Sequence, residues 1–181
     1  MDAYWIFEKV KRLVRRCGTC DPFRAAEESG IWLYDLPPTE RLLGMYTYRW
    51  RHRMIFLKPD MEEALARMVM AHELGHDQLH RHLAGGAALR DLGLFSAEDA
   101  ANITEYEANA FAAHLLIDAE EAETLFRDGC DLYGAAARLR VNPNLLLIKC
   151  REMNRMGAQY RLPFEPDARF LRDAADRGTD F

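Results

Sequence analysis

The chain has 181 residues, of which 49% are hydrophobic, and a formal net charge of −5 at pH 7. This length suits one domain, or one domain with a small appendage, and is sufficient for a buried hydrophobic core. The negative charge provides no overall basic field for nucleic acid or an anionic membrane, and no secretory leader or run of about 20 apolar residues is visible, so we expect a soluble cytoplasmic protein.

Residues 4–16 (YWIFEKVKRLVRR) have the pattern of an amphipathic helix. Phe7, Val10 and Val14 share one side, and basic residues occupy the rest of the circumference. A basic amphipathic helix can bind a membrane or an acidic partner. We favour the simpler interpretation of a surface helix with a solvated basic face.

A second short helix, FRAAEES, follows Asp21-Pro22 and is expected to end at Gly30. Before it, Cys17 and Cys20 have the C-x-x-C spacing, but no second pair follows that would complete a zinc ribbon. The pair also follows a basic helix instead of the strand that a thioredoxin-like motif requires. We therefore expect ordinary reduced cysteines.

Three segments are rich in aromatic and β-branched residues: IWLYDL (31–36), LLGMYTYRW (42–50) and RMIFL (53–57). They predict one short strand followed by a hairpin, with Lys58-Pro59 closing the sheet. The expected fold class is therefore α+β: a small antiparallel or mixed three-stranded sheet packed on the following helix, and then a mostly helical C-terminal part.

Asp60 is expected to cap that helix, with Glu63 three residues later in an approximate capping box. The helix is predicted to continue to about Leu83 and to stop at Gly85-Gly86.

Another helix is expected to begin near Ser96 or Thr104 and to contain the segment EYEANAFAAHLLI. The chain from about 119 to 160 is also predicted to be helical, with a break at Asn142-Pro143.

The first of these two long helices contains AHELGHDQLH. His72 and His76, four residues apart, lie on one helix face, so both imidazoles can bind one ion. Glu73 can reach a metal-activated water without itself binding the ion, as a general base would. Gly75 leaves room for close approach of another backbone. Because catalytic zinc uses three protein ligands and an open position, this pattern requires a third ligand.

Two further histidines are poor candidates for that ligand. His80 lies about 12 Å along the helix axis from His72, too far for bonds of about 2 Å to converge. His82 has the spacing that another class of zinc peptidases uses, but those enzymes turn the chain at a glycine where this sequence has Leu79.

An acidic ligand from the next helix is the better solution. In EYEAN, Glu105 and Asn109 share a face, so Glu105 can bind the metal while Asn109 hydrogen-bonds the other nitrogen of a ligand histidine. Small residues nearby favour close helix packing. Glu107 points about 200° away from Glu105 around the helix and is the alternative ligand. Two histidines and a glutamate suit zinc best among the divalent ions.

HELGHDQLH followed by EYEANAFAAHLL resembles the ImmA/IrrE family of metallopeptidases. DPFRAAEESGI, GMY and RMIFL extend the similarity, which spans roughly residues 20–120. The resemblance implies a gluzincin-like fold in which His72, His76 and Glu105 bind zinc and Glu73 is the general base. It also implies a protein substrate, a helix-turn-helix repressor whose cleavage releases genes of mobile elements or stress responses.

One residue departs from the family pattern, because His114 stands where an acidic residue is common. We expect this histidine to alter the rim of the site and to leave the set of metal ligands unchanged.

The sequence does not identify a second oxyanion donor. The candidates are Tyr106, His80, His82 and His114. An exposed edge of the sheet, strand 42–50 or strand 53–57, is a hypothetical binding edge for an extended substrate.

Residues 136–157 contain a helix, a turn at Asn142-Pro143 and a second helix, a spacing that resembles a helix-turn-helix. The rival function is therefore a DNA-binding transcriptional regulator with a structural zinc site. We favour helices that pack on a peptidase, because the net charge is negative and LLLIK lacks the exposed polar residues of a recognition helix. An inactive metal-binding relic is a third reading, which the intact Glu73 disfavours.

These interpretations divide the chain into three parts. Residues 1–125 are expected to form a zincin-like metallopeptidase core, residues 126–162 a helical extension packed on it, and residues 163–181 a charged tail.

Overall fold

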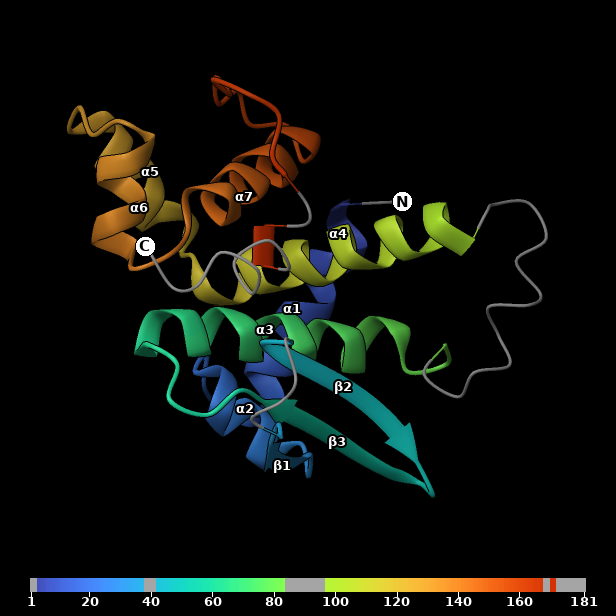
Figure 1. Ribbon diagram of the computed structural model, residues 1–181. Helices are drawn as coiled ribbons and strands as arrows, with labels where there is room; N and C mark the ends of the chain where they lie inside the picture. The colour runs from blue at the N-terminus through green and yellow to red at the C-terminus, as the bar shows by residue number, and fades with distance from the viewer. Residues whose placement is uncertain (1–2, 38–41, 84–96, 168–169, 172–181) are drawn as a thin grey trace.

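The computed structural model describes residues 3–37, 42–83, 97–167 and 170–171 (Figure 1). In chain order the elements are α1 (Ala3–Cys17), α2 (Pro22–Glu28), β1 (Trp32–Asp35), β2 (Gly44–Arg49), β3 (His52–Leu57), α3 (Glu63–His80), α4 (Ala97–Leu116), α5 (Ala119–Arg127), α6 (Leu132–Leu139) and α7 (Pro143–Arg155). The predicted α+β class is confirmed.

The three strands form one mixed sheet in the order β1-β3-β2. β2 and β3 form the predicted antiparallel hairpin, and β1 pairs with β3 in parallel. Trp50 and Arg51 make the two-residue connection with left-handed φ values of 51° and 66°, which fit a turn that follows the strand twist. Because β3 is the central strand, the alternative that strand 53–57 is an exposed edge is wrong.

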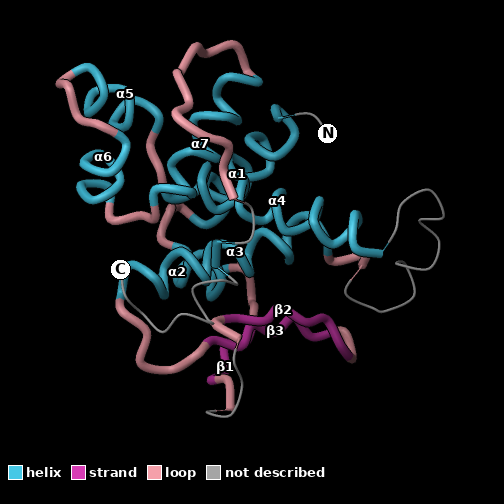
Figure 2. The backbone as a smooth tube through the Cα atoms, turned by 45° about the horizontal axis from the view of Figure 1, so that its top comes forward, coloured by secondary structure: helices cyan, strands magenta, loops and turns pink. Residues whose placement is uncertain are grey.

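α3 lies between the sheet on one side and α4 on the other, as Figures 1 and 2 both show. The helix is accordingly buried on more than one face: Leu65, Val69 and Leu74 are all at most 2% exposed. A helix enclosed in this way holds polar residues of its middle turns away from bulk water.

The start of α3 differs from the expectation. Asp60 does not cap the helix but lies in a turn with φ 59°, a conformation that aspartate tolerates better than most residues. Glu62 is the N-cap, and its carboxylate accepts the backbone N–H groups of Ala64 and Leu65. A glutamate is not among the residues usually preferred for this position, which is why the sequence favoured Asp60.

The end of α3 also comes earlier than predicted. The helix ends at His80, and residues 81–83 form a turn instead of a further helical turn. The predicted stop at Gly85-Gly86 and the possible helix start at Ser96 lie outside the described residues.

α1 and α2 form as expected, and Asp21 caps α2 by accepting the backbone N–H of Arg24. The most buried residues of α1 are Ala3, Ile6, Val10 and Leu13, so the inward face is centred about one residue before the predicted one. All four cysteines are free of disulfide bonds in the structure.

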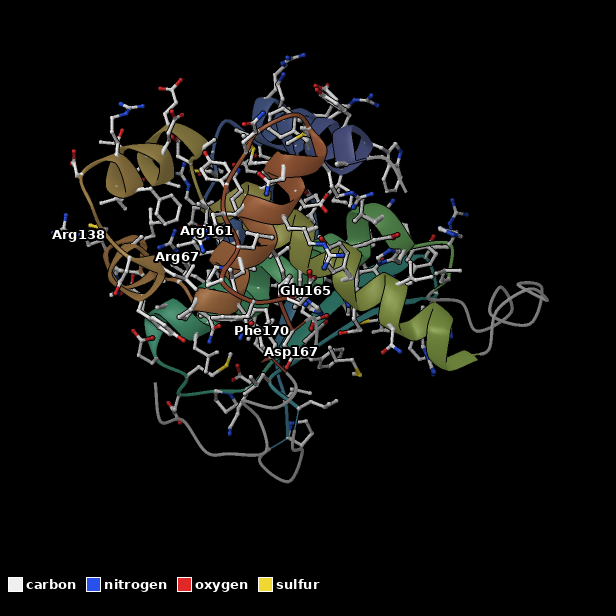
Figure 3. All side chains as sticks on the ribbon, turned by 90° about the horizontal axis from the view of Figure 1, so that it is seen from above. Arg67, Arg138, Arg161, Glu165, Asp167 and Phe170 are labelled. Atoms are coloured by element: carbon white, nitrogen blue, oxygen red, sulfur yellow. The ribbon has the colours of Figure 1, made fainter. Side chains whose placement is uncertain are left out.

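The predicted break at Asn142-Pro143 separates α6 from α7, and Asn142 caps α7. After α7 the chain returns along that helix: Arg151 pairs with Glu165 at 2.7 Å, and the Asp167 backbone N–H donates to Asn144 at 3.2 Å. Figure 3 labels Glu165, Asp167 and Phe170, which follow α7 in the chain. Phe170 is 6% exposed, so part of the segment expected to be a charged tail contributes to the core.

Among the described helices, none combines the length and the apolar character that crossing a membrane would require.

Candidate metal centre

The structure brings His72, His76 and Glu105 together between α3 and α4. His72 Nε2 lies 3.0 Å from His76 Nε2 and 3.4 Å from Glu105 Oε2, and His76 Nε2 lies 3.5 Å from Glu105 Oε1. Tetrahedral zinc with bonds of about 2.0–2.1 Å would separate neighbouring ligand atoms by about 3.3 Å. The three side chains therefore have the chemistry and the spacing of a group that could hold a metal ion.

This convergence depends on the close packing of two antiparallel helices, which lie against one another in Figure 1. A Cβ atom on Gly75 would lie 2.9 Å from both the Cα and the carbonyl oxygen of Ala108. Gly75 and Ala108 thus let the backbones approach at the level of the site, as the sequence predicted. Phe111, fully buried, fills the space beside the contact.

The second nitrogen of His72 has the predicted partner. His72 Nδ1 lies 2.8 Å from Asn109 Oδ1, and Asn109 is fully buried. Because an amide oxygen only accepts, Nδ1 carries a proton, and in the neutral ring Nε2 then presents its lone pair to the centre of the cluster.

The second nitrogen of His76 has a partner that the sequence reasoning missed. His76 Nδ1 lies 3.1 Å from His80 Nδ1, and His80 Nε2 lies 2.8 Å from Glu107 Oε2. The signal was present, since His76 and His80 are four residues apart on one face. From the sequence, His80 is a rejected ligand and a candidate oxyanion donor, and its contact with His76 is not predicted.

Glu73 lies at the contact between α3 and β2, 5% exposed. A Cβ on Gly44 would come within 2.8 Å of Glu73 Oε1, so glycine at this strand position makes room for the carboxylate. Burial raises the pKa of Glu73 to about 7, with the Glu105 charge acting in the same direction, while His72 and the backbone N–H of Tyr46 oppose the rise. A bound cation would also favour the ionised form.

The two histidines differ in their electrostatic surroundings. Burial lowers the pKa of His72, but hydrogen bonding to Glu105 and the charges of Glu73 and Glu105 outweigh this effect and raise it overall. Burial lowers the pKa of His76 to about 3, and the neighbouring His72 acts in the same direction. His76 is therefore a neutral imidazole at neutral pH, the form that binds metal.

The sheet is fixed to α3 one residue after His76. The side chain of Asp77 is fully buried and pairs with Arg53 of β3 at 3.3 Å and with Arg81 at 3.0 Å. Because the carboxylate is buried, losing its partner Arg53 would be costly, so this contact holds β3 against α3 beside the site.

The remaining candidates do not join the cluster. Glu107, the alternative ligand, is bonded to His80, and His82 is exposed beyond the end of α3. Tyr106 donates its hydroxyl proton to Glu152 at 2.8 Å. His114 is not at a rim: it is 7% exposed and contacts Lys149, with its ring against Phe7 of α1. A second oxyanion donor is not identified among these residues.

Comparison with known sequences gives two findings. The profile of the Peptidase_M78 family, described as IrrE N-terminal-like domain, matches residues 26–151, more than half of the chain. "Uncharacterized immunity region protein 2" of Bacillus phage phi105 is 32% identical over 108 residues, which cover 60% of this chain. The matched part spans 65% of the length of that curated relative. The family match extends beyond residues 20–120, where the motifs showed the resemblance, and reaches α7.

Proposed function

Because the chain belongs to the Peptidase_M78 family of IrrE N-terminal-like domains, we propose that it is a zinc-dependent endopeptidase with His72, His76 and Glu105 as the metal ligands. The observation that carries the proposal is the convergence of these three ligand groups, all within 4.8 Å of one another, beside a buried glutamate. Two imidazoles and one carboxylate are one of the ligand sets found in catalytic zinc sites, in which the fourth position stays open for water or substrate.

When bound, zinc would supply Lewis acidity and lower the pKa of a coordinated water towards about 7. The chain's own contribution is the placement of the donors, because Asn109 holds His72 with its Nε2 directed at the cluster. Fixed donors reduce the reorganisation that metal binding would otherwise require.

Glu73 acts as the general base. It accepts a proton from the water that attacks the scissile carbonyl carbon, and it delivers that proton to the amide nitrogen as the C–N bond breaks. The products are a carboxylic acid and an amine, so atoms and protons balance. A carboxylate with a pKa raised to about 7 suits both transfers at neutral pH.

β2 is the strand best placed to bind an extended substrate. It forms one edge of the sheet, and a Cβ on its Gly44 would meet the side chain of Glu73. A substrate segment that pairs with this edge by β-addition would pass beside the general base. Proline at the backbone donor positions of the substrate is then expected to block cleavage, and unaffected cleavage would argue against this pairing.

The proposed substrate is a helix-turn-helix repressor, cleaved to derepress mobile-element or stress genes. Support comes from the family, and from the phage relative, whose name describes an immunity region protein.

The rival function, DNA binding, has less support. α7 would be the recognition helix, but residues 145–150 are all buried, whereas a recognition helix presents exposed side chains to the groove.

The test compares the chain with its Glu73→Gln variant, which keeps the proposed ligands. Each protein, loaded with zinc, is added to an extract of cells that encode the chain, and new protein N-termini are identified by mass spectrometry. We expect new N-termini within a helix-turn-helix repressor in the extract that received the unchanged chain, and not in the extract that received Glu73→Gln. Identical N-termini in both samples would contradict the proposed peptidase function, and new ones confined to other proteins would contradict the repressor as substrate.

A further inference from the structure

His80 and Glu107 form a buried pair directly behind the candidate metal centre. His80 is 7% exposed and Glu107 is 4% exposed. The Glu107 Oε2 to His80 Nε2 distance is 2.8 Å, and Glu107 Oε1 has no hydrogen-bond partner among the described residues. His80 is therefore the partner of one oxygen of this buried carboxylate, and this bond holds Glu107 at His80 and not at the cluster.

The direction of each hydrogen bond follows from the chemistry of the groups. An ionised carboxylate only accepts, so His80 Nε2 carries a proton. In a neutral imidazole the other nitrogen is then an acceptor, so His80 Nδ1 accepts the proton that His76 Nδ1 donates across 3.1 Å. His76 Nε2 is consequently unprotonated, and this is the atom that faces His72 and Glu105.

We propose that His80 and Glu107 are positioning residues that hold His76 in its metal-binding tautomer. The proposal rests on the proposed metal site and extends it by one step. α4 then supplies a ligand, Glu105, together with a partner for each histidine. Asn109 holds His72 directly, and Glu107 holds His76 through His80.

The support of His76 differs from that of His72 because Glu107 is a carboxylate, whereas Asn109 is an amide. Hydrogen bonding to an anion increases the basicity of His80 as an acceptor, and this effect is passed to the His76 imidazole. Loss of such an outer partner typically weakens metal binding by about 10–100-fold. We expect a loss of this size for His80→Ala and for Glu107→Ala. Glu107→Gln should lose less, because its amide oxygen can still accept from His80.

The first measurement needs no variant and no metal. Long-range ¹H–¹⁵N correlation spectra of the metal-free protein at neutral pH report which ring nitrogens carry protons. We expect His76 protonated at Nδ1 and bare at Nε2, and His80 protonated at Nε2 and bare at Nδ1. A proton on His76 Nε2, or protons on both nitrogens of His80, would overturn the proposal.

The second measurement compares zinc affinities by competition with a chromophoric chelator. His82→Ala is the matched control, because His82 is exposed just beyond the end of α3. Circular dichroism confirms that each variant is folded. If His80→Ala and Glu107→Ala bind zinc as tightly as the unchanged chain, the positioning role is refuted while the proposed metal site stands. If the unchanged chain itself binds no zinc, the proposed function fails. The ¹H–¹⁵N spectra of the metal-free protein then still show whether the hydrogen bonds from His76 to His80 and from His80 to Glu107 exist.

Discussion

Gly75 of α3 packs directly against the backbone of Ala108 in α4: a Cβ on Gly75 would stand 2.9 Å from that backbone. Real Cβ atoms do not come this near to a backbone, so any larger residue at Gly75 must push the helices apart. Since α3 carries His72 and His76 while α4 carries Glu105, this contact sets the distance between the proposed ligands.

The Gly75→Ala substitution is therefore expected to damage both stability and metal binding. Overpacking costs about 1–3 kcal/mol, which outweighs a gain of at most about 1 kcal/mol in helix propensity. Urea unfolding and zinc competition measure the two effects. Gly134→Ala in α6 is the control, because a Cβ there would meet a side-chain oxygen of Asp131 at 3.1 Å and no backbone of another described helix. A Gly75→Ala variant that is stable and binds zinc tightly would refute the packing argument.

Gly44→Ala should separate catalysis from metal binding. The new Cβ would lie 2.8 Å from Glu73 Oε1 and 2.6 Å from Val69, so the Glu73 side chain must move. The three nearest atoms to this Cβ belong to Val69 and Glu73 and not to the proposed ligands. We expect the turnover of a cleaved protein substrate to fall at least tenfold while zinc content, measured by mass spectrometry, stays at one ion per chain. Equal losses of zinc and turnover would instead indicate general damage to the site.

Tyr106→Phe should destabilise the fold through the contact between α4 and α7. The Tyr106 hydroxyl donates to Glu152, which is fully buried and also pairs with Arg155 at 2.8 Å. Loss of a hydrogen bond to a buried charge costs about 1.5–3 kcal/mol. Chemical denaturation of Tyr106→Phe and of Tyr133→Phe, an exposed tyrosine, would show the difference. Equal stability of the two variants would mean that this bond contributes little.

The buried Lys149 is expected to make the free energy of unfolding rise with pH. It is 3% exposed, and burial lowers its pKa to about 8, although Asp118 acts in the opposite direction. Between pH 8 and about 10 the unfolded chain therefore retains a proton that the folded chain has lost. Stability should rise by up to about 1.4 kcal/mol per pH unit in this window.

Lys149→Met removes the titrating group and keeps the volume. We expect this variant to lack the rise and to be more stable than the unchanged chain at pH 7, in urea unfolding followed across this pH range. Parallel pH profiles of the two proteins would show that Lys149 does not titrate as inferred. His114, which contacts Lys149 at 3.3 Å, stays neutral here because burial lowers its pKa to about 3.

The helical and strand segments could be predicted because their periodicity and capping residues are local. The placement of Glu105 and Asn109 could also be inferred, since helix geometry fixes which side chains share a face. The position of His72 against Asn109 then follows from two helices that pack closely.

Other features depend on contacts between distant segments. The sequence predicts neither contact of His80, because its partner Glu107 belongs to another helix. The cap at Glu62 and the left-handed Asp60 depend on how the chain leaves β3, which local preferences do not encode. Phe170 and Leu171 were assigned to a tail because two apolar residues show no periodicity, yet both are buried.

The most direct test of the account is an anomalous-difference map at the zinc absorption edge, from crystals of the zinc-loaded protein. We predict a single strong peak about 2.0–2.2 Å from His72 Nε2, His76 Nε2 and a carboxylate oxygen of Glu105. Glu107 should remain bonded to His80, outside bonding distance of the ion. A peak coordinated by Glu107 or by the cysteines, or no peak at this cluster, would contradict the central claim.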